Sequence, residues 1–213
     1  MTRRSLFALA TAGLAAQKKD EPMKNDPLYH IPSDLPVPVD DGACRHLPGM
    51  QVPAITLGST AKRRVNMADL ARERTVIYGY PRTGKPGQAI PKGWDEIPGA
   101  RGCTPETCSF RDHYQRLREL HVQVFGLSTQ TTEYQREVVE RLHLPFEILS
   151  DADFALTNAL RLPTFEFEGV RLLKRLTLIL AGGKIEKVFY PVFPPDKHAE
   201  EVVGWLASHP PVS

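Results

Sequence analysis

Two cysteines five residues apart, Cys103 and Cys108, are the residues whose type and spacing indicate chemistry in this chain. They stand in the run 102–112 (GCTPETCSFRD), whose threonine and proline predict the start of a helix. Backbone N–H groups at a helix start lack partners within the helix and carry partial positive charge. A thiol placed there is favoured as the thiolate, which is the reactive form. Since a second thiol nearby can capture an oxidised first one, the run predicts a redox site.

A thiolate at a helix start also needs a cation. Holding a cysteine as thiolate at neutral pH requires about 3.4 kcal/mol, whereas a helix N-terminus supplies about 2 kcal/mol at most. Arg101 is adjacent but lies in a predicted loop, and Arg111 has Asp112 beside it as a surface partner. Arg175 opens an apolar strand, where a functional cation would be held rigidly. The alternative, in which Arg175 only caps that strand, stays open at this point.

A disulfide between the two cysteines requires a change of backbone. Five residues of intact helix rise about 7.5 Å, which exceeds the limit of about 7 Å between bridged Cα atoms. The first turn must therefore unwind, and Gly99 and Gly102 lie just upstream to allow it. The expected cycle alternates between a folded reduced state and a locally unfolded disulfide state.

Other interpretations of the cysteines are weaker. Two inert, half-buried thiols would also fit the spacing alone. A zinc site needs further ligands at short spacing, which the three scattered histidines His113, His121 and His143 do not provide. The third cysteine, Cys44, is interpreted as a lone thiol, with a role as alternative resolving partner left open.

The elements that would position the site alternate between strand and helix. A helix is expected over 105–120, with Thr104 as its N-cap. Strands are predicted at 54–57, 75–80, 122–127, 146–149, 172–180 and 185–190, and further helical segments at 67–70, 131–142, 151–160 (with Asp153 as its cap) and 199–206. This order predicts an α/β fold with a central mixed sheet flanked by helices. Residues 83–102 contain eight glycines and prolines, so they are expected to form a long functional loop.

Composition limits the remaining possibilities. The 213 residues suit one domain, 41% are apolar, and the net charge is +2, so no nucleic-acid or membrane partner is expected. Three cysteines suit a reducing compartment, which favours the cytoplasm. Residues 1–22 resemble a short export signal, or else form a leader before Met23. We assign 1–35 to a leader or arm and 36–208 to the domain.

With these residues in view, the run 102–112 resembles the active-site helix of the peroxiredoxins, specifically the bacterioferritin comigratory (PrxQ) group. The resemblance extends over about 47–206 and implies a thioredoxin-like fold with peroxiredoxin additions. It implies that Cys103 is the peroxidatic cysteine and Cys108 the resolving one. It also matches Arg175 to the active-site arginine of the family, and Glu106 to the glutamate three residues past the peroxidatic cysteine.

The chain departs from the family at one place. The family usually carries Pro-x-x-x-Thr-x-x-Cys, but Ala100 stands where that threonine is expected. The segment 80–83 (YPRT) resembles the first part of the motif, separated from Cys103 by the inserted loop 83–102. We expect Pro81 to shield the site, and the missing hydroxyl to come from Thr83 or Thr104. Trp94 in the insertion is expected to wall off the pocket or to bind a partner.

The leading hypothesis is a thiol-dependent peroxidase. It would reduce hydrogen peroxide or an organic hydroperoxide, form a Cys103–Cys108 disulfide, and be recycled by thioredoxin or a glutaredoxin-like dithiol, as a monomer or weak homodimer without metal, haem or flavin. The alternative is a redox-sensing or binding protein that the same disulfide switches without efficient turnover. A disulfide reductase is less favoured, because the usual C-x-x-C spacing is absent.

Overall fold

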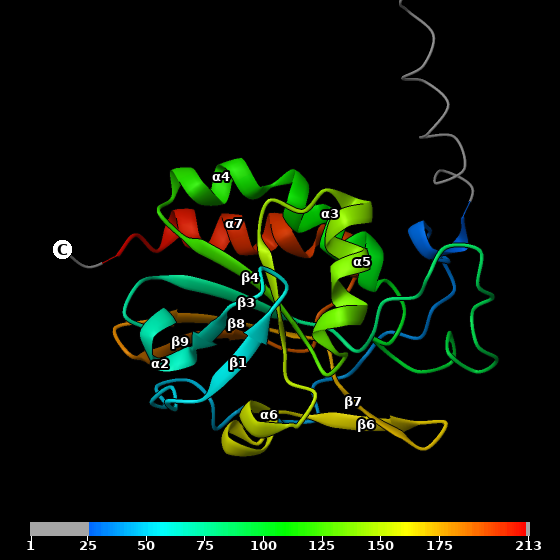
Figure 1. Ribbon diagram of the computed structural model, residues 1–213, viewed down its shortest axis with the longest axis horizontal. Helices are drawn as coiled ribbons and strands as arrows, with labels where there is room; N and C mark the ends of the chain where they lie inside the picture. Colours follow the sequence, from blue (N-terminus) through cyan, green and yellow to red (C-terminus); the bar gives the residue numbers. More distant parts are fainter. Residues whose placement is uncertain (1–25, 212–213) are drawn as a thin grey trace, which may run out of the picture.

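A seven-stranded mixed sheet forms the centre of the fold in the computed structural model, which describes residues 26–211 (Figure 1). Its strands are β1 (Thr56–Ser59), β2 (Arg64–Asn66), β3 (Thr75–Gly79), β4 (Gln123–Ser128), β5 (Glu147–Ser150), β8 (Leu176–Ala181) and β9 (Lys184–Phe189), in the spatial order β2-β1-β5-β4-β3-β8-β9. Strands β3, β4 and β5 are parallel neighbours, and the outer pairs are antiparallel. The predicted α/β fold with a central mixed sheet is confirmed.

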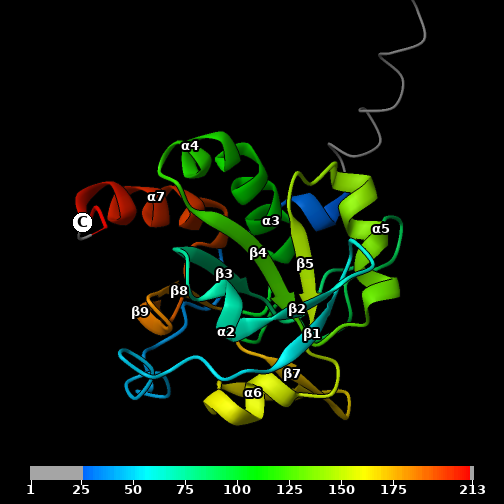
Figure 2. The ribbon, with the colours of Figure 1, turned by 60° about the vertical axis from the view of Figure 1, so that its left-hand side comes forward.

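Helices cover both faces of the sheet. They are α2 (Met67–Leu70), α3 (Cys103–Asp112), α4 (Tyr114–Glu119), α5 (Thr132–Leu142), α6 (Ala155–Leu160) and α7 (His198–Ser208), with 3-10 turns η1 (Pro27–Tyr29) and η2 (Pro195–Lys197). Helices α3, α4, α5 and α7 pack on one face, whereas α2 and α6 pack on the other (Figures 1 and 2). None of the helices within 26–211 has the length and apolar character needed to cross a membrane.

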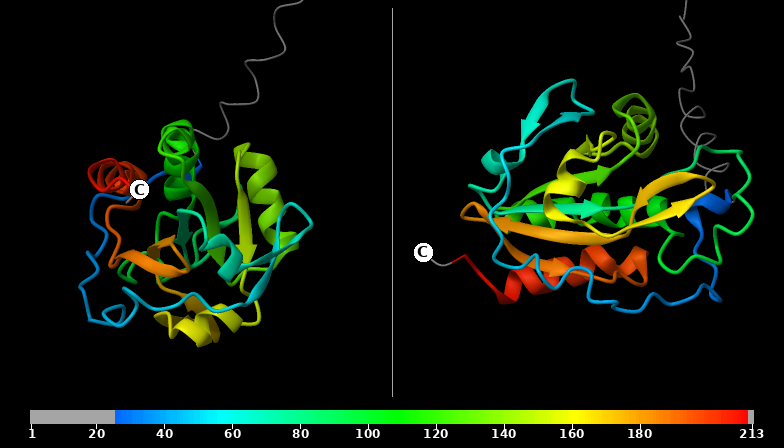
Figure 3. Two further views of the ribbon diagram at one scale, coloured as in Figure 1. Left: turned by 90° about the vertical axis from the view of Figure 1, so that its left-hand side faces the viewer. Right: turned by 90° about the horizontal axis from the view of Figure 1, so that it is seen from below.

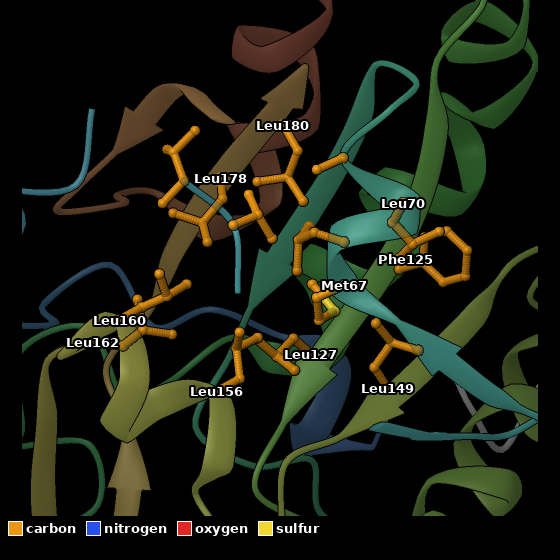
Figure 4. Close-up of a cluster of buried hydrophobic side chains, with 14 of the residues drawn as sticks. Met67, Leu70, Phe125, Leu127, Leu149, Leu156, Leu160, Leu162, Leu178 and Leu180 are labelled. Carbon is orange, nitrogen blue, oxygen red and sulfur yellow. The ribbon is translucent and has the colours of Figure 1, made fainter. Parts of the chain in front are cut away.

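The alternation of side chains along β3 divides the core into two clusters. Val76 and Tyr78 point toward α3 and α7, while Ile77 points toward α2 and α6. Figure 4 shows the cluster on the face covered by α2 and α6. There, Met67 of α2 and Leu156 of α6 pack with the strand residues Leu127 and Leu178. Strand β3 is buried along its whole length, and the segment that leads into the loop 83–102 follows directly after it.

The helix that carries the cysteines differs from its predicted form. Instead of one helix over 105–120 there are two, α3 and α4, which meet at His113. The first begins at Cys103, so Thr104 lies inside it and is not the N-cap. Gly102 occupies that position with φ of +98°, and a Cβ there would lie 2.4 Å from Cγ of Pro195. Only glycine meets both conditions, and the helix therefore starts two residues earlier than the cap pattern predicts.

The predicted strand 172–180 is interrupted between Leu173 and Leu176. It consists of β7 (Val170–Leu173) and β8, and the two residues between them include Arg175. Strand β7 pairs with β6 (Thr164–Phe167) in a separate hairpin that the sequence analysis missed. The hairpin turns at Glu168 and Gly169, which both have positive φ. Because the chain leaves one sheet and enters another here, Arg175 turns inward rather than continuing a strand.

One predicted cap is also displaced. Asp153 does not cap α6, since the carboxylate of Asp151 accepts hydrogen bonds from the backbone N–H groups of Leu156 (3.0 Å) and Thr157 (2.8 Å). Strand β2, which pairs with β1 at one edge of the sheet, was likewise not predicted. Neither difference reaches the cysteine site.

The loop 83–102 is confirmed as a segment without helix or strand. It lies beside the segment 26–31, as Figure 3 shows, and Arg101 donates to the backbone oxygens of Pro27 and His30. The buried Leu28 lies close to Gly84. This part of the predicted N-terminal arm thus contacts the domain, while the predicted signal at 1–22 lies outside the described residues, and the division at residue 35 stays a prediction.

Candidate active site

The structure brings Arg175 directly to Cys103. Nη2 of Arg175 lies 3.2 Å from Sγ of Cys103, and both side chains are almost completely buried. The guanidinium also donates to the backbone oxygens of Gly99 (3.2 Å), Ala100 (3.2 Å) and Arg101 (3.1 Å). These bonds to the end of the inserted loop fix the cation in one orientation, so it does more than cap a strand.

Glu106 completes the charged group from one turn along α3. Its carboxylate accepts a charge-assisted hydrogen bond from Nη1 of Arg175, and the side chain is wholly buried. Burial raises the pKa of Glu106, whereas the Arg175 guanidinium acts to lower it. The second carboxylate oxygen has no hydrogen-bond partner among residues 26–211. The carboxylate therefore holds Nη1 of Arg175, while Nη2 of the same guanidinium contacts the thiol.

Several groups determine the ionisation of Cys103. Burial raises the pKa of its thiol, while the Arg175 guanidinium and the backbone N–H of Arg82 act to lower it. The sulfur lies 3.6 Å from the backbone oxygen of Ala100, an acceptor that the protonated thiol can use. The start of α3 and the predicted cation are thus both in place, and desolvation of the buried thiol opposes them.

A cavity of about 360 Å³ opens next to Cys103. Thr83 and Thr104 line it together with Arg82, Trp94 and Gln130. Pro81, which was expected to shield the site, is buried at the end of β3 but does not line the cavity. The two threonines expected to supply the missing hydroxyl therefore both line the cavity at Cys103, in spite of the insertion that separates Thr83 from Cys103 in sequence.

Thr83 is held in a network of side chains. Its hydroxyl donates to Oε1 of Gln130 (3.2 Å), while its backbone oxygen accepts from Nε2 of Gln130 (3.1 Å) and from the Tyr134 hydroxyl (3.0 Å). Sequence reasoning missed Gln130 and Tyr134. The signal for Gln130 was topological, because residues that follow the parallel neighbours β3 and β4 meet at the same sheet edge.

Cys108 lies apart from the cavity. It occupies the second turn of α3, it is half-buried, and it is not bonded to Cys103, because all three cysteines are free thiols. Burial raises the pKa of the Cys108 thiol and Arg111 acts to lower it. Arg111 also pairs with Asp112 at 2.8 Å, as predicted. Of the three candidate arginines, only Arg175 reaches the first cysteine.

Cys44 is buried in the core cluster on the sheet face opposite that of Cys103. Within residues 26–211, no group of three or more His, Cys, Asp or Glu side chains is arranged to hold a metal ion.

Comparison with known proteins agrees with this geometry. The Redoxin family model matches residues 47–203. The chain is 29% identical over 161 residues to chloroplastic peroxiredoxin Q of Sedum lineare, covering 75% of this chain and 77% of that protein. It is also 29% identical over 163 residues to peroxiredoxin Bcp of Escherichia coli strain K12, covering 74% of this chain and 93% of that protein.

Solved structures show the same fold. Peroxidoxin BcpB of Mycobacterium tuberculosis superposes with a TM-score of 0.61 at 22% identity, covering 77% of this chain and 99% of that one. Peroxiredoxin Q of Xanthomonas campestris superposes with a TM-score of 0.61 at 21% identity, covering 76% and 98%. The expected resemblance to peroxiredoxins of the bacterioferritin comigratory group is confirmed, and with the family model spanning most of its length, the chain belongs to the Redoxin family.

Proposed function

We propose that this chain is a thiol-dependent peroxidase in which Cys103 reacts with hydrogen peroxide or an organic hydroperoxide. One observation carries the proposal: a buried guanidinium lies 3.2 Å from the sulfur of a cysteine at a helix start, and that cysteine lines a cavity. The relatives named peroxiredoxin support the same chemistry.

In the first step, the Cys103 thiolate attacks one oxygen of the peroxide and the O–O bond breaks. The sulfur becomes a sulfenic acid, and the other oxygen leaves as water or an alcohol once it has gained a proton. Arg175 stabilises the thiolate and the negative charge that develops on the leaving oxygen. Glu106 keeps the arginine oriented, and Thr83 supplies the hydroxyl that position 100 lacks.

In the second step, the Cys108 thiol condenses with the Cys103 sulfenic acid and water is released. Both cysteines lie in α3, so the first turns of this helix must unwind before the sulfurs can meet. An external dithiol protein, thioredoxin or a glutaredoxin-like reductant, then reduces the disulfide. We propose that the enzyme acts in a reducing compartment, the cytoplasm, as a monomer or weak homodimer.

A coupled turnover assay tests the cycle. NADPH consumption is followed with thioredoxin, thioredoxin reductase and hydrogen peroxide, for the wild type and for Cys103→Ser, Cys108→Ser and Cys44→Ser. The wild type and Cys44→Ser should turn over repeatedly, while the other two variants should not. If the wild type is oxidised once and thioredoxin fails to recycle it, the sensing alternative replaces the peroxidase.

A further inference from the structure

The segment 26–31, named here the N-terminal strap, lies against α3 but is anchored elsewhere. Its turn η1 contacts the helix, and Figure 2 shows this turn in dark blue beside α3. The Tyr29 hydroxyl accepts a hydrogen bond from Nη1 of Arg141 in α5 at 2.7 Å. The Asp26 carboxylate accepts one from the backbone N–H of Gly87 in the inserted loop at 3.1 Å. The strap is therefore held by parts of the protein that carry no cysteine.

Two contacts join the strap to the start of α3. The buried guanidinium of Arg101 donates to the backbone oxygens of Pro27 and His30. One residue later, Gly102 faces the strap, since a Cβ on this glycine would lie 3.5 Å from Cδ1 of Ile31. The N-cap of α3 and the residue before it are thus both in contact with the strap.

The contacted residues belong to the part of α3 that the disulfide step must open. The backbone N–H of Glu106 donates to the oxygen of Gly102 at 3.0 Å, and this bond closes the first turn of the helix. A disulfide between Cys103 and Cys108 requires that turn to unwind. Because the strap packs on the same turn, unwinding has to break contacts with the strap as well as hydrogen bonds within the helix.

We propose that the N-terminal strap stabilises the folded start of α3 and thereby limits the rate of the disulfide step. It acts as a conformational control on the resolving reaction and takes no part in the reaction with peroxide. Linkage requires the converse, so oxidation that unwinds the helix start must loosen the strap by the same factor. The inference rests on the proposed function in that it takes Cys103 and Cys108 as the pair that forms the disulfide.

Two substitutions in the full-length protein weaken the strap without changing a cysteine. Arg101→Met removes the donors to the strap, and Ile31→Ala removes the side chain that meets Gly102. After one addition of hydrogen peroxide, rapid-quench mass spectrometry follows the conversion of the Cys103 sulfenic acid to the disulfide. This conversion should be about fivefold to tenfold faster in each variant than in the wild type, because opening the helix breaks fewer contacts.

Hydrogen exchange provides a second measurement, part of which needs no peroxide. In the reduced protein, the backbone amides at 106–108 should exchange faster in both variants than in the wild type, by the same factor as the disulfide step. In the wild type, oxidation should speed exchange of the strap amides Leu28 and Tyr29. These amides donate to the side chain (2.9 Å) and the backbone oxygen (3.0 Å) of Asp26.

Arg74→Met and Ile55→Ala are the matched controls. Arg74 is also a buried arginine, but it pairs with Glu186 at 2.8 Å and donates to the backbone oxygen of His209, away from the start of α3. Ile55 is half-buried, as Ile31 is, and packs on the opposite face of the sheet. Neither control should change the disulfide step or the exchange of α3.

A disulfide step and an exchange of α3 no faster than in the wild type, in either strap variant, would overturn the inference. Equal acceleration in the controls would also overturn it, because the effect would then come from a general loss of stability. Ile31→Ala carries the test if Arg101→Met fails to fold. A wild type that forms no Cys103–Cys108 disulfide would instead refute the proposed function, and exchange in the reduced variants would still decide the role of the strap.

Discussion

Arg175 contacts both Cys103 and Glu106 in the interior of the protein, joining a reactive sulfur to a buried carboxylate through one guanidinium. The arginine comes from the break between β7 and β8, whereas both of its partners lie on α3. The contact therefore ties the first turn of α3 to the central sheet, and the chemistry and the stability of this region depend on the same side chain.

Removing the guanidinium should separate these two effects. Arg175→Met should lower the rate constant for peroxide oxidation of Cys103 about 100-fold or more, because a fixed donor to the developing charge is lost. It should also lower the free energy of unfolding by about 3–5 kcal/mol, since the Glu106 carboxylate is left buried and unpaired. Stopped-flow oxidation and urea denaturation measure the two quantities.

The double variant Arg175→Met/Glu106→Gln provides the control for stability. Removing the unpaired charge should recover much of the lost stability. It should recover only a small part of the lost rate, because the Glu106 charge raises the pKa of Cys103 but its removal supplies no donor to the leaving oxygen. A double variant that regained the full wild-type rate of oxidation would show that Arg175 acts through folding alone.

The pH dependence of oxidation should follow the thiol of Cys103. Only the thiolate reacts, so the rate constant should rise with pH until the thiol is fully ionised. Since Arg175 acts to lower the pKa of Cys103 against the effect of burial, Arg175→Met should move this rise to higher pH. Arg101→Met is a suitable comparison, because Arg101 is also buried but pairs with Asp95 at 3.1 Å. A rise at the same pH in the wild type and Arg175→Met would contradict the proposed electrostatic role.

Thr83 and Thr104 both line the cavity, but they should differ in their effect on the rate. The Thr83 hydroxyl is fixed by Gln130, so Thr83→Val should slow oxidation about tenfold through loss of one hydrogen bond to the peroxide. Thr104→Val removes a hydroxyl of the same cavity and should change the rate less. Measuring kcat/KM with hydrogen peroxide for both variants decides between them, and the reverse order would assign the hydroxyl to Thr104.

Much of this site was predictable from local sequence. The short helix Met67–Leu70, the strand Thr75–Gly79 and the irregular loop 83–102 each follow from signals within a few residues, and the structure confirms them. The start of α3 was misplaced because Gly102 is selected by contact with Pro195, which is distant in sequence. No local pattern reports such a contact.

The surroundings of Arg175 show a second limit. The run 172–180 predicts one strand. In the structure it belongs to two sheets, because β7 pairs with β6 whereas β8 pairs with β3. The pair Glu168–Gly169, between stretches of strand-forming residues, was the missed signal of that hairpin. The contacts of Arg82 and Gln130 with the site arise from tertiary packing, so motif reading alone did not find them.

Oxidation should unfold the start of α3. In the reduced protein both cysteines lie in this helix, and a disulfide between them requires its first turns to open. Hydrogen exchange of the backbone amides at 103–108 should therefore be faster in the oxidised protein than in the reduced one. Helix α5, which carries no cysteine, serves as the internal reference. Equal protection of α3 in both states would rule out this disulfide.

Cys44 should take no part in the cycle. It is buried, and burial, followed by the negative charges of Asp41 and Asp40, raises its pKa to about 12, so it stays protonated at neutral pH. Iodoacetamide should label Cys108 before Cys44 in the native protein, as mass spectrometry of peptides would show. A Cys44–Cys103 disulfide after peroxide treatment would contradict this assignment.

The most direct test of the central claim is a single-turnover oxidation of the reduced Cys108→Ser protein by hydrogen peroxide. The reaction is followed by stopped-flow fluorescence, and the product is trapped for mass spectrometry. Cys103 should react on the order of a thousandfold faster than free cysteine at the same pH and accumulate as a sulfenic acid. Oxidation at the rate of free cysteine, or a sulfenic acid on another residue, would contradict the assignment of Cys103 as the peroxidatic thiol.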